Sequence, residues 1–565
     1  MKTTLQILTI ILLFSQLTCS FLKSEEVKSI PKEKIHRFAT KILNGMSDEE
    51  KAGQVIHIAV PGREVDEETI EEIQKIKPGG VILFGYNLGS KSQIKNLTKS
   101  LQAEVRNLKL PPLFISTDQE GGRVVRVEKG VTSFPGAMAL GQNNNNANTY
   151  NVGLVTSYQL NRLGINVVFA PSLDINNNPD NPVINTRSFG STVEIVTKWG
   201  TMYEQGARDG GALPVIKHFP GHGDTNVDSH LGLPQIQKTE KELEDFELIP
   251  FKTAISKGAK AVMSAHIVFP KIDSEYPATL SEKILTKILR EKLKFSGLVF
   301  TDAMEMDAIS KSYKNVKRGT LAILAGADVV LLTSFGKNTI EYRNMILESM
   351  RKDEFIRDGV NVLDEAIHRQ ICLKIEQGLF DSETSFFKIE DEEIKSFLAS
   401  RNKIAIDKYE AIKKQGLEEL NRKVSIDAVK SYKKYFTPPK PEVVKTFKFV
   451  IKNDRMKEDL ELFDIEPITE KKFKKLLKSK VRANYVIDTK DQNDLNKVEK
   501  IIRANPNSNF IILHYGSPFL VLPQQENVDI LFSFSPTDIS LSSLILRLLN
   551  SNPDNLIQTT DLILK

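Results

Sequence analysis

The chain has 565 residues but only two cysteines, Cys19 and Cys372. Cys19 falls in a segment that resembles an export signal, so a mature chain would keep Cys372 as its one thiol inside the folded part. An internal disulfide is therefore excluded, even in an oxidising compartment. We expect packing alone to stabilise the fold.

A strong excess of one charge is also missing. Lys and Arg number 77 against 72 Asp and Glu, which leaves a net charge of +5. Over this length such a balance does not indicate a nucleic-acid partner, and we expect none. We interpret the basic cluster at residues 471–480 as the solvated face of an amphipathic helix, with a polyanion contact as the alternative.

Long apolar runs are scarce as well. Beyond the amino terminus, no segment offers the roughly 18 uninterrupted apolar residues of a membrane-spanning helix. Residues 1–20 resemble a signal peptide, because Lys2 precedes a short apolar stretch and small residues follow it. We expect an exported, periplasmic or extracellular protein. Acylation of Cys19 would add a lipid anchor, although Gln16 and Thr18 depart from the usual lipoprotein box.

The main organising pattern is a set of short apolar runs separated by stretches of helical length. The runs do not alternate, as expected for strands buried on both faces. Repeated eight times, this pattern predicts a (β/α)8 TIM-type α/β barrel. The runs are residues 55–60, 80–84, 113–116, 166–169, 213–216, 261–263, 298–300 and 328–332.

Composition suggests four parts along the chain. We expect a signal peptide at 1–20, the barrel at 30–381, a charged helical linker at 382–425 and a smaller α/β domain at 426–565. A capping box at Ser47–Glu50 predicts the start of a helix before the first strand. Strand-like runs at 447–451, 485–487, 510–514 and 530–534 support the second domain.

Residues 217–230 gather three histidines, two aspartates and a lysine around a proline and glycines. Such a segment forms a shaped loop rather than core structure. His218 and His222 have the spacing of helical metal ligands, but Pro220 interrupts the helix that would bring them to one face. We therefore favour acid/base chemistry by Asp228 and His230 over metal binding.

Polar residues follow five of the predicted strands at their carboxyl ends. In barrels of this class that end carries the active site. Ordinary strand ends do not explain both signs of charge and two histidines gathered there, so we predict an active site. The residues are Asp118, Asp174, Lys217 with His218, His266 and Asp302.

Four ordered motifs point to a family. The segments 217–225 (KHFPGHGDT) with 228–230 (DSH), 295–304 (FSGLVFTDAM), 118–126 (DQEGGRVVR) and 185–190 (NTRSFG) resemble the β-N-acetylglucosaminidase branch of the family 3 glycoside hydrolases. The resemblance runs from about Met46 to Asp381. It implies a barrel with a carboxyl-terminal α/β sandwich that removes terminal N-acetylglucosamine from peptidoglycan fragments or chitin-type oligosaccharides.

The resemblance also implies roles for single residues. Asp302 matches the nucleophile, and His230 the acid/base with Asp228 as its partner; an imidazole can donate a proton in one step and accept one in the next. We expect Asp302 to be ionised beside cations such as Lys217. The residues matching the groups that hold the sugar hydroxyls are Asp118, Arg126, Arg187, Lys217 and His218.

Several residues close to these motifs are not predicted as sugar contacts. We interpret His222 as shaping its loop. Arg123 and Asp224 fit loop-bracing ion pairs as well as substrate contacts, so we leave them out of the predicted site. His266 is either a brace or a substrate contact. We expect no metal and no cofactor.

Other functions stay open. A β-glucosidase or β-xylosidase would keep the fold, but Asp228 and His230 count against it. A non-catalytic sugar-binding lipoprotein is disfavoured, because Asp302, Asp228 and His230 are all present. Phosphate could replace water as the acceptor, since a histidine repels an anion less than a glutamate does. As partners we expect an oligosaccharide or muropeptide substrate, and we expect a monomer.

Overall fold

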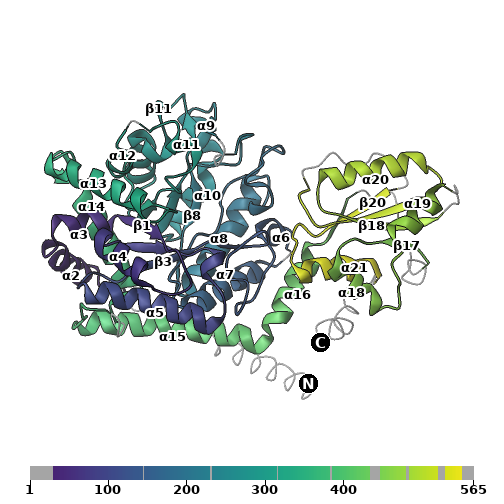
Figure 1. Cartoon of the computed structure of the whole chain (residues 1–565), viewed down its shortest axis with the longest axis horizontal. Coiled ribbons are helices and arrows are strands. Elements are labelled where there is room, and N and C mark those ends of the chain that lie inside the picture. Colours follow the sequence, from purple (N-terminus) through teal and green to yellow (C-terminus); the bar gives the residue numbers. More distant parts are fainter. Residues whose placement is uncertain are drawn as a thin grey trace, which may run out of the picture.

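The computed structural model describes residues 29–143, 145–228, 232–314, 316–381, 385–432, 446–478, 483–518 and 528–549. Within these ranges no helix has the length and apolar character needed to cross a bilayer. The predicted signal peptide, Cys19 and His230 lie outside the described residues. Figure 1 shows a large α/β unit and a smaller one, joined by long helices.

The larger unit is a closed barrel of parallel strands. β1 pairs with β13 on one side, and a parallel bridge from Phe300 to Val329 connects β12 to β13. Only Val215 separates β7 from β8, and each predicted run overlaps this set of parallel strands, which fits the predicted α/β TIM-type barrel. The strands are β1 (Ile56–Ala59), β2 (Gly80–Ile82), β3 (Phe114–Thr117), β6 (Val167–Val168), β7 (Leu213–Pro214), β8 (Ile216–Phe219), β9 (Ala261–Ser264), β12 (Leu298–Phe300) and β13 (Val330–Leu331).

Helices cover the outside of this barrel (Figure 1). The first begins as its capping box predicts, with the Ser47 hydroxyl accepting from the Glu50 N–H and the Glu50 carboxylate accepting from the Ser47 N–H. The helices are α3 (Asp48–Gln54), α4 (Glu67–Ile76), α5 (Lys91–Asn107), α7 (Asn146–Asn161), α8 (Val193–Asp209), α10 (Leu248–Ser256), the π-helical η4 (Lys283–Lys292), α12 (Arg318–Ala325), α13 (Lys337–Arg351) and α14 (Val362–Glu376).

The barrel core has two layers. Apolar side chains that point from the strands into the barrel interior form one cluster. In it Phe169 and Phe300 meet edge to face with ring centroids 5.7 Å apart. A second, larger cluster lies between strands and helices. At the amino end, Lys374 of α14 is fully buried, and its Nζ donates to the Gly79 carbonyl at 2.8 Å. Burial lowers the pKa of Lys374 to about 7.

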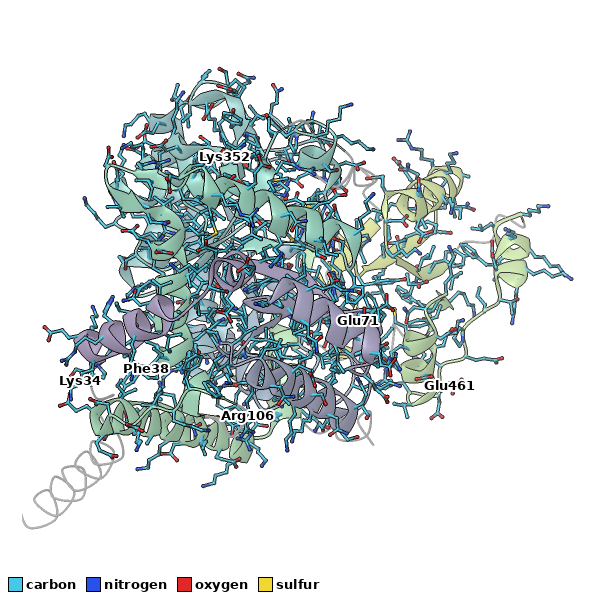
Figure 2. All side chains as sticks on the ribbon, turned by 60° about the vertical axis from the view of Figure 1, so that its left-hand side comes forward. Lys34, Phe38, Glu71, Arg106, Lys352 and Glu461 are labelled. Carbon is cyan, nitrogen blue, oxygen red and sulfur yellow. The ribbon has the colours of Figure 1, made fainter. Side chains whose placement is uncertain are left out.

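Two further helices lie on the outside of the barrel, one before its first strand and one after its last. α2 (Lys32–Asn44) packs on α14, and α15 (Glu392–Gln415) follows the barrel surface to α16 (Leu417–Ala428). Figure 2 shows α2, with Lys34 and Phe38, beside α15. Lys34 Nζ lies 3.2 Å from the Asp391 carboxylate, and Tyr158 stacks on Tyr409 with centroids 4.0 Å apart. α15 is therefore fixed at both of its ends.

The smaller unit is a sheet with helices on both faces. Its strand order is β16-β20-β19-β18-β17, parallel except for β16. The strands are β16 (Lys430–Tyr432), β17 (Lys448–Val450), β18 (Asn484–Thr489), β19 (Asn509–His514) and β20 (Val528–Phe532). α19 (Glu470–Lys478) and α20 (Gln492–Ala504) cover one face, and α18 (Asp454–Glu461) and α21 (Asp538–Leu549) the other. Its kinship with the sandwich domain that accompanies many family 3 barrels stays a prediction.

The two units share a hydrophobic contact. Met138 and Ala139 of α6 (Ala137–Gly141) belong to the same buried cluster as Phe534 of the smaller unit. In α19, Phe473 is buried while the neighbouring lysines are exposed, which confirms the predicted amphipathic face of this basic segment.

Candidate active site

A pocket of about 580 Å³ opens at the carboxyl ends of the barrel strands. Of the predicted site residues that the structure describes, seven line it, and Asp174 and His266 lie behind the lining. The seven are Asp118, Arg126, Arg187, Lys217, His218, Asp228 and Asp302. A larger pocket of about 710 Å³ lies between α5, α7 and α15, but its lining has no carboxylate and no histidine among the described residues. The chemistry therefore belongs to the first pocket.

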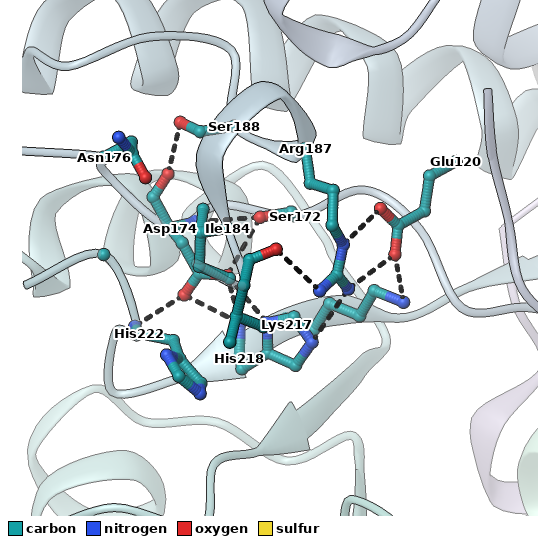
Figure 3. A network of polar contacts seen from close by, with 12 residues as sticks. Glu120, Ser172, Asp174, Asn176, Ile184, Arg187, Ser188, Lys217, His218 and His222 are labelled. Atoms are coloured by element: carbon teal, nitrogen blue, oxygen red, sulfur yellow. Dashed lines mark hydrogen bonds and ion pairs between the residues drawn. The ribbon is translucent and has the colours of Figure 1, made fainter. Parts of the chain in front are cut away.

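Asp174 is the centre of a buried hydrogen-bond network (Figure 3). Its side chain is 0% exposed and accepts from the His218 Nδ1 at 2.7 Å, the His222 N–H at 2.7 Å and the Ser172 hydroxyl at 2.9 Å. Burial alone would raise the pKa of Asp174, but His218 and these donors hold it well below its usual range. Asp174 therefore stays ionised and fixes the His218 ring.

The loop after β8 is pressed against the segment that carries Asp174. A side chain at Gly223 would place its Cβ 1.7 Å from the Ile175 carbonyl oxygen, so only glycine fits there. Asn181 Nδ2 donates to the His222 carbonyl at 2.8 Å. This agrees with the prediction of a shaped loop without helix at Pro220.

His222 shapes the same loop. Its Nδ1 lies 3.1 Å from the Thr225 hydroxyl, and its ring also reaches the pocket lining. Burial, followed by the neighbouring His218, lowers the pKa of His222 to about 4. The ring is therefore neutral at physiological pH.

Two cations are clamped by carboxylates on the opposite wall (Figure 3). Lys217 Nζ lies 2.9 Å from Asp118 Oδ1 and 2.7 Å from Glu120 Oε1, and its side chain is only 2% exposed. Arg187 donates to both Glu120 oxygens, at 2.8 and 2.9 Å. Burial would raise the pKa of Glu120, but Arg187 and Lys217 lower it below its usual range. Arg187 Nη2 also donates to His218 Nε2 at 3.4 Å, which joins this wall to the Asp174 network.

Glu120, which pairs with both Lys217 and Arg187, joins the candidate site, although the sequence analysis did not single it out. Two buried cations on neighbouring elements require opposite charges, because an unpaired buried charge is very costly. A signal for it existed: Glu120 lies two residues after Asp118 in the same motif.

Arg126 is held at the rim by a hairpin of β4 (Gln119–Gly121) and β5 (Val124–Val125). The Gln119 side chain accepts from the Arg126 N–H at 3.0 Å, and Arg126 Nη2 lies 3.8 Å from Asp118. Gly121 has a φ of +84°, and a Cβ there would lie 2.7 Å from the Pro135 carbonyl oxygen. Within the described part of the chain, the buried Arg126 Nε has no hydrogen-bond partner, so it is a donor available to a ligand.

Asp224 and Arg123, which the predicted site left out, differ in their position relative to the pocket. Asp224 pairs with Lys238 at 2.9 Å, away from the pocket lining. Arg123 does brace the loop, since its Nη2 donates to the Val183 carbonyl at 3.1 Å, but it also lines the pocket. It therefore joins the candidate site.

Asp302 follows β12 at the floor of the pocket. Its Oδ1 accepts from the Ala303 N–H at 2.8 Å. Burial would raise the pKa of Asp302, but His266 and His218 outweigh it and the pKa is lowered. Lys217, the cation named from the sequence, contributes less than either histidine. Asp302 is therefore a carboxylate at neutral pH.

His266 acts as a brace for this carboxylate. Its Nε2 donates to the Ala303 carbonyl at 2.9 Å, and its Nδ1 lies 2.9 Å from the Thr279 hydroxyl. Among the described residues that line the pocket, His266 is absent. Of the two roles left open for His266, brace or substrate contact, this geometry fits the brace.

Of the predicted acid/base pair Asp228 and His230, the structure describes only Asp228. Asp228 lines the pocket together with Asp302, and its carbonyl accepts from the Gly232 N–H at 3.0 Å. His230 lies outside the described residues, so the role of Asp228 towards it stays a prediction.

An aromatic wall was also missed. Phe84 and Tyr86 stack with centroids 5.7 Å apart and line the pocket, with Tyr86 53% exposed. Both follow the carboxyl end of β2, which was the available signal. Exposed aromatic faces at a polar pocket suit the apolar face of a ring-shaped ligand.

The comparisons agree with this geometry. A sequence profile described as "Glycosyl hydrolase family 3 N terminal domain" matches residues 47–360. The chain is 39% identical over 282 residues to "Beta-hexosaminidase A" of Pseudoalteromonas piscicida, a match that spans 47% of this chain and 47% of that protein. It is 34% identical over 283 residues to "Beta-hexosaminidase" of Methylobacillus flagellatus, covering 49% and 79%.

A solved structure extends the likeness beyond the barrel. The "glycoside hydrolase family 3 beta-N-acetylglucosaminidase from Paenibacillus sp. str. FPU-7" superposes with a TM-score of 0.76 at 28% identity. The alignment covers 89% of this chain and 97% of that one.

Proposed function

Because the chain belongs to glycosyl hydrolase family 3, we propose that it is an exo-acting, retaining β-N-acetylglucosaminidase. The observation that carries the proposal is the convergence of Asp302 and Asp228 in one pocket with Asp118, Lys217 and Arg187. A fixed carboxylate facing an array of sugar-binding donors suits hydrolysis of a glycosidic bond.

The reaction proceeds in two steps. An Asp302 oxygen attacks the anomeric carbon while the bond to the leaving oxygen breaks, and the His230 imidazolium gives that oxygen its proton. In the second step neutral His230 takes a proton from water, whose oxygen attacks the same carbon and releases Asp302. Asp228 stabilises the imidazolium in the first step.

Support for the nucleophile comes from its electrostatics. The pKa of Asp302 is lowered despite burial, because His266 and His218 lie near it. The Ala303 N–H holds one carboxylate oxygen, which orients the other. A carboxylate fixed and ionised in this way is ready to attack without reorganisation.

Support for sugar recognition comes from the paired charges. Lys217, Asp118 and Arg187 are each held by a partner of opposite charge, so their remaining donors and acceptors point in fixed directions. A sugar that lacks a matching hydroxyl would leave these groups unpaired, and such a loss is discriminated strongly. Arg126 Nε offers a further donor.

Peptidoglycan fragments or chitin-type oligosaccharides are the proposed source of the terminal sugar. Relatives named β-hexosaminidase favour an N-acetylhexosamine over glucose or xylose. The match spans about half the length of one such relative, so the substrate is proposed from the site and the names together. Export, through the predicted signal at residues 1–20, would bring the enzyme to cell-wall or chitin material.

A panel of nitrophenyl glycosides tests the proposal. We expect release from the β-N-acetylglucosaminide and at least about 100-fold less from the β-glucoside and β-xyloside, since mismatched polar groups cost several kcal/mol. A preference for glucoside or xyloside would replace the sugar in the proposal. No turnover by the wild type on any of them would favour the non-catalytic reading.

Product analysis separates water from phosphate as acceptor. Muropeptides incubated with and without phosphate should give free N-acetylglucosamine in both cases. A sugar 1-phosphate as the main product would overturn the hydrolase assignment and keep the glycosyl-enzyme chemistry.

A further inference from the structure

A second cluster of chemically active side chains lies at the opposite end of the barrel. It borders a pocket of about 280 Å³ lined by residues that precede β9 and β12, together with residues of α2 and α14. Lys260 and Gly297 mark these strand beginnings. The proposed sugar chemistry does not use this pocket.

The cluster consists of His36, His368 and Cys372. One ligand atom from each lies within 4.8 Å of the other two. Cys372 Sγ is 3.9 Å from His36 Nδ1 and 3.8 Å from His368 Nδ1, and the two imidazole rings stack with centroids 5.1 Å apart. Among the described residues this is the one group of histidine, cysteine and acidic side chains with metal-binding spacing.

The backbone brings these atoms together from two helices. His368 and Cys372 are four residues apart on the continuous helix α14, so they share a face. His36 comes from α2, which packs on α14. Phe38, labelled in Figure 2, lies two residues further along α2. It meets Phe380 edge to face with ring centroids 5.9 Å apart and so fixes that helix.

A further contact directs the lone pair of His368. Its Nε2 lies 3.3 Å from the His36 carbonyl oxygen and 3.2 Å from the Thr40 hydroxyl. Because a carbonyl only accepts, Nε2 carries the proton, and Nδ1, 3.8 Å from Cys372 Sγ, is left as the ligand nitrogen. Ligating histidines are commonly oriented by such a bond from the other ring nitrogen.

We propose that His36, His368 and Cys372 bind Zn²⁺. A tetrahedral zinc ion with one sulfur and two nitrogen ligands would hold sulfur and nitrogen roughly 3.5 Å apart, close to the separations found here. Two imidazoles and a thiolate are the ligand set that a borderline-soft ion such as zinc prefers. All three residues line the small pocket, from which water would supply the fourth ligand.

The surrounding charges allow the ion. Four lysine and arginine side chains border the pocket. Lys260 lies 3.4 Å from Glu376 and Arg369 pairs with Asp328 at 2.8 Å, while Lys32 and Lys294 are exposed to solvent. Cys372 is 8% exposed. A zinc thiolate requires loss of the thiol proton, so one proton leaves for each ion bound.

Cobalt(II) titration of the full-length protein, first stripped with a chelator, tests the site. We expect one equivalent to produce a thiolate-to-cobalt charge-transfer band, and zinc to abolish it. Cys372→Ser should lose the band, and His36→Ala or His368→Ala should weaken binding by at least about 100-fold, since even indirect partners of a metal cost 10–100-fold. Arg37→Ala, an exposed neighbour on α2, is the matched control and should bind normally.

Hydrolysis of a nitrophenyl sugar reports folding in each variant, because the cluster lies at the other end of the barrel. Two results would overturn the proposal. One is wild-type protein that binds cobalt without the charge-transfer band. The other is a band that survives in a folded, active Cys372→Ser variant, which would assign the thiolate to Cys19.

Discussion

Each end of the barrel carries a pair of residues spaced four apart, but the two pairs differ in backbone conformation. The carboxyl end has His218 and His222 at a strand end and its loop, and the amino end has His368 and Cys372 on a helix. The members of the first pair are tied to Asp174 and Thr225 through different atoms. The second pair lies on the continuous helix α14, so both side chains lie on the same face of that helix, with Sγ 3.8 Å from Nδ1. A spacing of four residues therefore predicts neighbouring side chains only where the backbone is helical.

The two ends also treat buried charge differently. At the carboxyl end, Lys217 and Arg187 each contact a carboxylate, so both cations stay charged in a buried place. At the amino end, Lys374 contacts only neutral acceptors within the described part of the chain, such as the Gly79 carbonyl, and burial lowers its pKa to about 7. Opposite charge, more than hydrogen bonding alone, keeps a buried cation ionised.

The strongest test of the carboxyl end as the catalytic end is Asp302→Ala. We expect turnover to fall below about 1% of wild type, because the covalent route is removed. Added azide should restore part of the activity by attacking the vacant face. Activity well above that level without azide would move the nucleophile elsewhere, while circular dichroism controls for folding.

His230→Gly probes proton donation. Glycosides with poor leaving groups should lose about 10²–10⁴-fold, and activated ones much less, because only the former need a proton on the departing oxygen. Asp228→Ala should show a milder form of the same pattern. Equal losses on both substrate classes would mean that the loop only positions the sugar.

Glu120→Gln breaks the charge balance at the carboxyl end. Two buried cations would lose their shared partner, which costs about 3–5 kcal/mol when a buried pair is broken. We expect a higher KM and a lower unfolding midpoint at neutral pH. The carboxylate has a lowered pKa, so its contribution is present above about pH 4.3 and fades as pH falls further.

The control is Glu247→Gln, a buried carboxylate that pairs with Lys238 away from the pocket lining. It should lower stability without a matching rise in KM. If both variants raise KM equally, Glu120 has no special link to the sugar.

The smallest expected effect concerns pH and His222. Its folded pKa of about 4 lies below the unfolded value near 6.5, so the unfolded chain binds more protons between these values and stability falls as pH drops through them. At pH 5 the loss is roughly 2 kcal/mol. His222→Gln should shrink the difference in unfolding midpoint between pH 7 and pH 5. An unchanged difference would place the acid sensitivity in other groups.

The barrel and most of the site were predictable for a physical reason. Strands buried on both faces are continuous apolar runs, and residues such as Asp118 and Asp302 stand where those runs end. The family profile confirms the resemblance that the four motifs indicated.

What escaped prediction depends on distant segments meeting. Glu120 matters because Lys217 and Arg187 reach it from two other parts of the chain. His36 and Cys372 are 336 residues apart, and only the packing of α2 on α14 joins them. The assignments of Asp302, Asp228 and His230 to the reaction remain predictions.

The long helix α15 decides how the protein can be divided. With 24 residues it spans roughly 36 Å, and it is secured by Lys34 at its start and by Tyr158 and Asp209 near its end. A fragment that stops at residue 381 would uncover the Tyr158 face and the pocket beneath α15. An isolated barrel for crystallisation or calorimetry should therefore keep residues up to the end of α15, with the cut placed near Gly416, where the helix already ends.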